Sequence, residues 1–183
     1  MKKLLWSGVV LGAIVLLPAT QVEALNITPS SPIVLSGNQT SQAQIDAYIA
    51  ATLGDAGLLY KQNVLGPEEG SLAGSYTTTF SNTVTQPEDA TITYVAGMQY
   101  VGPTSYLLVK DGNNSPAWYL FNLTNLGWDG KETLTLQDFW VGQGAISHVT
   151  LYGKALPEPA TLSLLAVGLV GAAVLRRRRP QGA

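Results

Sequence analysis

"SYLLVKDGNNSPAWYLFNL", residues 105–123, consists of two apolar runs separated by a short polar segment. Both runs are rich in aliphatic and aromatic residues, which favour strands. Asp111, Gly112 and Asn113 are typical of hairpin turns, because Asp, Gly and Asn tolerate the backbone conformations that a tight turn requires. The stretch therefore predicts a β-hairpin, and the hairpin indicates a mainly β fold.

On both sides of this hairpin the sequence alternates with the two-residue period of strands. Strands are predicted at 75–84, 90–96, 132–140 and 145–153, with Gly, Asn and Pro in the connections. A set of about six short strands over residues 75–153 indicates an antiparallel β-sandwich, and we expect it to be jelly-roll-like.

The preceding segment predicts one helix and little else. Residues 40–53 have helical periodicity, with Ser41 or Thr40 as the N-cap and Gln44 completing a capping box. We expect this N-terminal helix to pack at one end of the sandwich. Residues 25–39 predict an extended arm, and residues 55–74 predict mainly loop with a short strand at 58–62.

The amino terminus has the parts of a secretory signal peptide. Lys2 and Lys3 precede an apolar stretch at 4–17, and small residues lead to a cleavage site after Ala24. The apolar stretch is short for an uncleaved anchor, which needs about 20 residues. Signal peptidase is therefore an expected partner, and cleavage leaves residues 25–156 as one extracytoplasmic domain.

The composition of that domain excludes several functions. Residues 25–156 contain four lysines, no arginine and ten acidic residues, a formal charge of −6. Binding to nucleic acid depends on neutralising phosphates, so no nucleic-acid partner is expected. The whole chain lacks cysteine, which excludes disulfides, CxxC redox chemistry and cysteine–zinc sites.

The carboxyl terminus predicts a membrane helix. Residues 160–175 are uncharged and would form a helix of about 24 Å, somewhat short for a bilayer core of about 30 Å. Arg176, Arg177, Arg178 and Arg179 follow and should stay cytoplasmic under the positive-inside rule. The signal peptide and these arginines thus agree on one topology. The alternative, a buried core helix, does not explain the arginine cluster.

Before the helix stand Pro157, Glu158 and Pro159, and two prolines bracketing Glu158 favour an extended, accessible segment. With the apolar helix and the arginines, this segment resembles the PEP-CTERM sorting signal, here residues 157–183. The resemblance implies recognition by an exosortase, a membrane protease that cuts near Pro-Glu-Pro. A sortase signal would need Leu-Pro-x-Thr-Gly, and residues 156–160 lack both the Thr and the Gly.

Polar residues of the domain offer weaker chemistry. His148 is the only histidine, so a metal site built on several histidines is excluded, and a structural role within a strand is the favoured interpretation. Asp111 and Asn113 carry oxygens that suit calcium, but Pro116 stands where an EF-hand loop has glycine. A turn without metal is favoured, and neither a metal nor a cofactor is expected.

Tryptophans are the remaining candidates, because aromatic faces stack on sugar rings. Trp128 lies in the glycine-flanked "LGWDG" segment and is expected to be exposed, whereas Trp118 alternates with Tyr119, so that one of the two should be buried. Both tryptophans are candidate carbohydrate contacts. The competing interpretation is buried aromatic packing.

Three functions follow from these features. The favoured one is a non-enzymatic, exported protein, tethered to the inner membrane facing the periplasm and then moved to the cell surface or exterior. Proteins with the PEP-CTERM signal are found in Gram-negative bacteria that make extracellular polysaccharide, so the resemblance implies that it would there associate with extracellular polysaccharide or biofilm. The alternative is a carbohydrate-binding module of the matrix. The third is a hydrolase that uses His148 or a facing pair of acids, for which no Gly-x-Ser-x-Gly segment is present.

Overall fold

The computed structural model describes residues 24–54, 56–83, 85–95, 99–112, 114–157 and 167–173. Within these residues the chain forms ten strands in two sheets, and one helix, α1 (Gln42–Leu53), precedes most of the strands. Residues 167–173 are also helical. The fold is therefore mainly β with one early helix, as the sequence predicts.

The strands divide into a sheet of four and a sheet of six. The four-stranded sheet has the order β1 (Leu25–Ile27), β9 (Leu134–Leu136), β6 (Asp89–Tyr94) and β5 (Tyr76–Ser81). The six-stranded sheet has the order β2 (Ile33–Gly37), β8 (Trp118–Asn122), β7 (Gln99–Asp111), β10 (Ile146–Pro157), β3 (Gly57–Asn63) and β4 (Glu68–Glu69).

The predicted hairpin is the centre of the larger sheet. β7 and β8 pair in antiparallel register from Tyr106 opposite Asn122 to Lys110 opposite Trp118. The other side of β7 pairs with β10 over almost the whole length of both strands. The apolar runs on either side of the turn are buried on both faces, because one face meets the other sheet and the opposite face meets α1.

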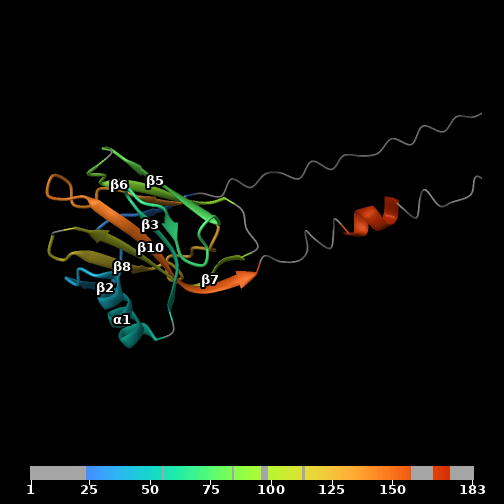
Figure 1. The fold of residues 1–183 in the computed structure, drawn as a ribbon, viewed down its shortest axis with the longest axis horizontal. Helices are drawn as coiled ribbons and strands as arrows, with labels where there is room; N and C mark the ends of the chain where they lie inside the picture. Colours follow the sequence, from blue (N-terminus) through green and yellow to red (C-terminus); the bar gives the residue numbers. More distant parts are fainter. Residues whose placement is uncertain are drawn as a thin grey trace, which may run out of the picture.

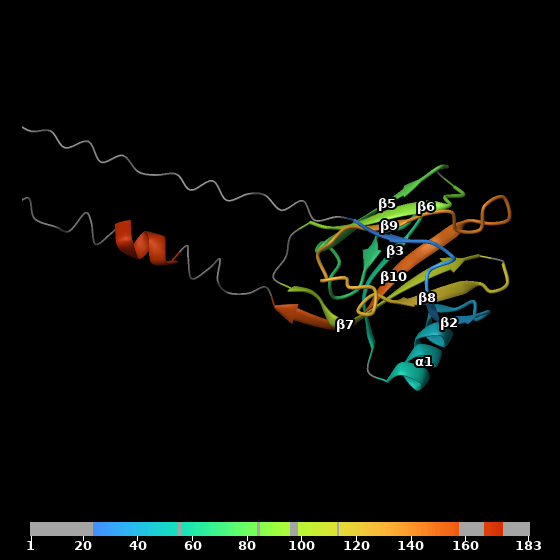
Figure 2. The ribbon, with the colours of Figure 1, turned by 180° about the vertical axis from the view of Figure 1, so that it is seen from behind.

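Three layers result (Figure 1). Ile27, Ile92 and Leu134 of the smaller sheet share one hydrophobic core with Val109 and Val149 of the larger sheet. α1 lies on the outer face of the larger sheet, where its fully buried Ile45 and Ile49 pack in a second cluster. Figure 2 shows the same layers from behind, with β5, β6 and β9 on one side of the molecule and α1 on the other.

The helix confirms its predicted cap and corrects its predicted place. α1 begins after Ser41, whose hydroxyl accepts a hydrogen bond from the Gln44 amide at 3.4 Å. It packs on a sheet face and not at one end of the sheets, because Ile45 and Ile49 form an apolar stripe that covers the apolar outer face of β7 and β8.

Two further expectations are wrong. The residues predicted as an extended arm form β1 and β2, so the sheets begin well before residue 75. The short strand predicted at 58–62 is confirmed as β3, and β4 follows it at Glu68–Glu69. The pairing is also not wholly antiparallel, since β1 runs parallel to β9, with Leu25 opposite Leu134. The jelly-roll order stays a prediction.

Candidate functional site

The end of β10 is where the folded domain meets the proposed sorting segment. Beyond Gly153 this strand continues, with Ala155 opposite Val101, Leu156 opposite Tyr100 and Pro157 opposite Gln99. Pro157 itself is exposed and extended. Glu158 and Pro159 lie outside the described residues.

The start of β7, which pairs with this end of β10, is held in place by side chains from other parts of the domain. The Val101 amide donates to the Tyr76 hydroxyl at 2.8 Å, and that hydroxyl donates to the Gly130 carbonyl at 2.6 Å. Burial raises the pKa of Tyr76, so the phenol stays protonated and able to donate. The Lys131 ammonium lies 4.5 Å from the centre of the Tyr100 ring, a cation–π contact.

The other targeting residues fall largely outside the described chain. Ala24, the predicted cleavage residue, is exposed immediately before β1. Of the predicted membrane helix at 160–175, residues 167–173 are described and helical. Arg176, Arg177, Arg178 and Arg179 are outside the described residues. Among the described residues, no helix has the length and apolar character needed to cross a membrane.

Comparison with protein families identifies this terminus. Residues 155–179 match the family model described as the PEP-CTERM protein-sorting motif. No curated protein and no solved structure matches the chain. The chain therefore carries a PEP-CTERM sorting motif, which implies exosortase-dependent sorting of an exported protein. The matched motif begins at residue 155, two residues before Pro157, and so starts inside β10.

The expected exposure of Trp128 is wrong. Only 5% of this residue is exposed, and its indole Nε1 donates to the Glu132 carbonyl at 2.7 Å. The loop turns inward because the Trp128 amide also bonds the Leu123 carbonyl, which brings the ring against Tyr76. Trp118 is fully buried beneath α1, where its ring meets Tyr48 edge-on. Neither ring has a free face for a sugar.

Asp111 serves the hairpin turn. Its carboxylate accepts the amides of Gly112 and Asn114, and also that of Ala145 at 3.3 Å in the neighbouring loop. Three backbone donors thus engage the oxygens that the sequence offered to calcium. Asn113 lies outside the described residues, so the suggested pair is not described as a whole.

His148 lies on the outer face of the larger sheet, paired with Lys110 and Asn63 across the ladder. It is 8% exposed, and its Nε2 has no hydrogen-bond partner within the described part of the chain. Burial, and secondarily the charges of Lys61 and Lys110, lower its pKa to about 3. The imidazole is therefore neutral at physiological pH, and the charged groups that act on it are lysines.

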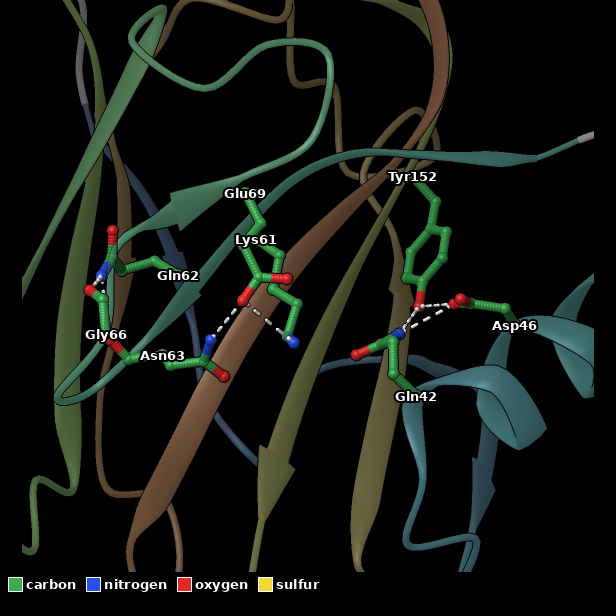
Figure 3. Close-up of polar contacts among 8 residues, drawn as sticks. All are labelled: Gln42, Asp46, Lys61, Gln62, Asn63, Gly66, Glu69 and Tyr152. Atoms are coloured by element: carbon green, nitrogen blue, oxygen red, sulfur yellow. Dashed lines mark hydrogen bonds and ion pairs between the residues drawn. The ribbon is translucent and has the colours of Figure 1, made fainter.

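Two polar clusters flank this face (Figure 3). On one side Glu69 accepts from Asn63 at 2.7 Å and lies 3.6 Å from the Lys61 ammonium. On the other side the Tyr152 hydroxyl donates to Asp46 of α1 at 2.7 Å and accepts from Gln42 at the same distance. The first cluster joins the edge strand β4 to β3, and the second joins α1 to β10, so both have a structural role.

Sequence reasoning missed a cleft at the end of the sheets where the hairpin turn lies. It has a volume of about 540 Å³, and its lining includes the amide residues Asn63, Gln86, Asn114 and Gln143. Among the described lining residues Asp111 alone is charged, and its carboxylate is already engaged by amides. The four amide residues come from the end of β3 and from three separate connections, so no local motif marks them in the sequence.

The loop at 138–144, whose Gln143 and Gly144 line this cleft, is held in an uncommon conformation. Asp138 and Trp140 have φ of 60° and 55°, a region that non-glycine residues rarely occupy. The amides of Asp138 and Gly142 donate to the side chains of Asp89 and Glu88, which hold this conformation. Trp140 stacks on Tyr119 with ring centres 5.3 Å apart. The loop that carries Gln143 and Gly144 is thus held by neighbouring elements.

Proposed function

We propose that the chain is a non-enzymatic, exported β-sandwich protein that an exosortase transfers to the cell surface or the extracellular matrix. There it associates with extracellular polysaccharide. The PEP-CTERM motif at 155–179, joined without a linker to the folded domain, carries this proposal. The acidic, arginine-free domain suits a partner that is not a polyanion such as nucleic acid.

Intact mass spectrometry of the protein from its native host tests the sorting step. The wild type should yield a species that begins near Leu25 and ends close to Pro157. A Glu158→Ala variant should yield a species that keeps the arginine cluster. If both proteins keep Arg176, Arg177, Arg178 and Arg179, the tail is a permanent anchor and the proposal fails.

Carbohydrate binding is a second candidate, and the amide-lined cleft favours it. Amide side chains donate and accept hydrogen bonds at once, as sugar hydroxyls do. Without a free charge in the described lining, the cleft suits a neutral, polar ligand better than an ionic one. This proposal moves the suggested contact from Trp118 and Trp128 to the cleft.

Retention of the protein on polysaccharide extracted from the host would test this candidate. Gln143→Ala removes an exposed cleft amide and should reduce retention. Gln44→Ala removes an exposed amide on α1 that is not part of the described cleft lining, and it should leave retention unchanged. Equal retention of the two variants and the wild type would exclude the cleft as the binding site.

A further inference from the structure

The sorting motif is partly built into the fold. Its first three residues, 155–157, are also the last three residues of β10. β3 stops pairing with β10 at Gly153, and β8 pairs with β7 only from Tyr106 onward. Beyond Gly153 the larger sheet is therefore reduced to a two-stranded ribbon, in which the start of β7 pairs with the start of the motif.

We propose that residues 99–102 of β7 are a docking strand for the sorting motif, and that the exosortase can process the chain only after residues 154–157 leave this strand. The proposal rests on the exosortase-dependent sorting described above. A protease that takes its substrate as an extended strand uses the same backbone N–H and C=O groups that a β-ladder occupies. While residues 155–157 pair with β7, the backbone groups on that edge of the segment are occupied. A protease that needs this edge, or that encloses the segment, can therefore bind only after the segment leaves β7.

The docking strand is shaped for this segment. A Cβ atom on Gly102 would lie 2.8 Å from Leu156 Cγ and 2.9 Å from the Lys154 carbonyl oxygen. Only glycine lets the two strands approach this closely. Val101 is fully buried opposite Ala155, and its amide donates to the Tyr76 hydroxyl. This hydrogen bond does not involve β10, so the docking strand keeps its place when the motif leaves.

The docked segment is built to detach. A register shift between Gly153 and Ala155 interrupts the ladder where the segment begins, and bulges of this kind locally disrupt pairing. The last residue, Pro157, has no backbone N–H and so cannot donate to the ladder. Lys154 and Pro157 are exposed. These features place a hinge at Gly153 and the weakest pairing at the motif itself.

An engineered disulfide tests the requirement for release, and the absence of native cysteine makes the result unambiguous. Val101→Cys with Ala155→Cys joins two directly opposite residues, whose Cα separation in an antiparallel ladder suits a disulfide. Neither residue belongs to Pro-Glu-Pro. The full-length variant would be incubated with host membranes, oxidised or reduced, and the loss of the tail followed by intact mass.

Processing should be lost in the oxidised variant and restored by the reductant. Thr79→Cys with Thr91→Cys, which joins β5 to β6 in the other sheet, is the matched control and should be processed equally in both states. Equal processing of the oxidised and reduced Val101–Ala155 variant would overturn the proposal, although sorting itself would stand. Failure of the wild type to be processed would instead refute the proposed function.

A second variant keeps the test decisive if the cysteine pair impairs processing even when reduced. Gly102→Ala should push residues 154–156 away from β7 and speed processing several-fold. Gly57→Ala, a strand glycine of the same sheet whose added Cβ meets only the Gly153 carbonyl at 3.9 Å, should not change the rate. An unchanged or slower rate for Gly102→Ala would contradict release as a required step.

Discussion

His148 makes the stability of the domain depend on pH in a defined direction. Its pKa in the folded state is about 3, compared with about 6.5 in an unfolded chain. The unfolded state therefore binds this proton first on acidification. The stabilisation is complete above about pH 6.5 and is lost as the pH falls toward 3, by roughly 5 kcal/mol at about 1.36 kcal/mol per pKa unit.

Replacement of His148 by leucine should remove this contribution. The free energy of unfolding, measured in urea at pH 7.5 and pH 4.5, should fall less on acidification for His148→Leu than for the wild type. Since Nε2 of His148 has no partner in the described chain, the substitution should cost little at pH 7.5. An equal pH dependence of the two proteins would show that His148 takes up its proton between pH 7.5 and pH 4.5 in the folded state as well.

Trp128 should matter for stability and not for ligand contact. Trp128→Ala removes a ring packed against Tyr76 and should lower the free energy of unfolding by about 3 to 5 kcal/mol. Trp128→Phe keeps most of the packing, loses the bond to the Glu132 carbonyl and should cost about 1 kcal/mol. Loss of polysaccharide retention by a folded Trp128→Phe protein would contradict this assignment.

Trp128 also shows what a single-residue interpretation misses. Glycines on both sides indicate a loop, and Trp128 does lie outside the strands. Whether a loop side chain points outward depends on long-range packing, here on Tyr76, which is distant in sequence. The prediction that one of Trp118 and Tyr119 is buried is confirmed, because Trp118 is fully buried beneath α1. The alternation did not indicate which of the two, since both faces of β8 are covered.

At the level of elements, α1 is attached to the sheet by apolar packing and by one polar cluster. Tyr152→Phe removes the hydroxyl that donates to Asp46 and accepts from Gln42, and it should lower the free energy of unfolding by about 1 to 2 kcal/mol. Tyr48→Phe, on an exposed position of the same helix, is the control and should be nearly neutral. Equal urea midpoints for the two variants would show that the cluster adds no net stability.

The elements that the sequence predicted are those specified locally. The β7–β8 hairpin has its turn residues between two apolar runs, and α1 has Ser41 at its start and a helical period after it. β1 was missed because its three residues gain their structure from β9, more than a hundred positions away. β2 was missed because it pairs with β8, and its Ile33 and Val34 remain partly exposed at the sheet edge.

For the whole molecule, the last strand runs past its predicted end at residue 153 and reaches Pro157. A chain that ends at Pro157 should unfold at the same urea midpoint as the full chain. A chain that ends at Gly153 uncovers Val101 and should lose about 1.5 to 3 kcal/mol, the usual value for burying such a side chain. Equal midpoints for both truncated chains would show that residues 154–157 do not contribute to the fold.

The sorting motif was predictable from sequence because its parts stand side by side: two prolines around Glu158, an apolar run and four arginines. The cleft was not predictable, since Asn63, Gln86, Asn114 and Gln143 meet only when the end of β3 and three separate connections reach one end of the sheets. The pairing of residues 155–157 with β7 was missed for a similar reason. No residue near Pro157 in the sequence indicates that a glycine at position 102 allows β7 and this segment to approach each other closely.

The ribbon at the end of β10 also determines how the domain bears load. A protein held at a surface by its carboxyl end receives any pull first at Pro157, the unsupported end of the ribbon. A pull away from the sheet opens the pairs with Gln99, Tyr100 and Val101 one at a time, which takes little force. Past Gly153, β10 is flanked by both β3 and β7, and resistance should rise sharply. The short ribbon would then open and lengthen under tension before the rest of the domain unfolds.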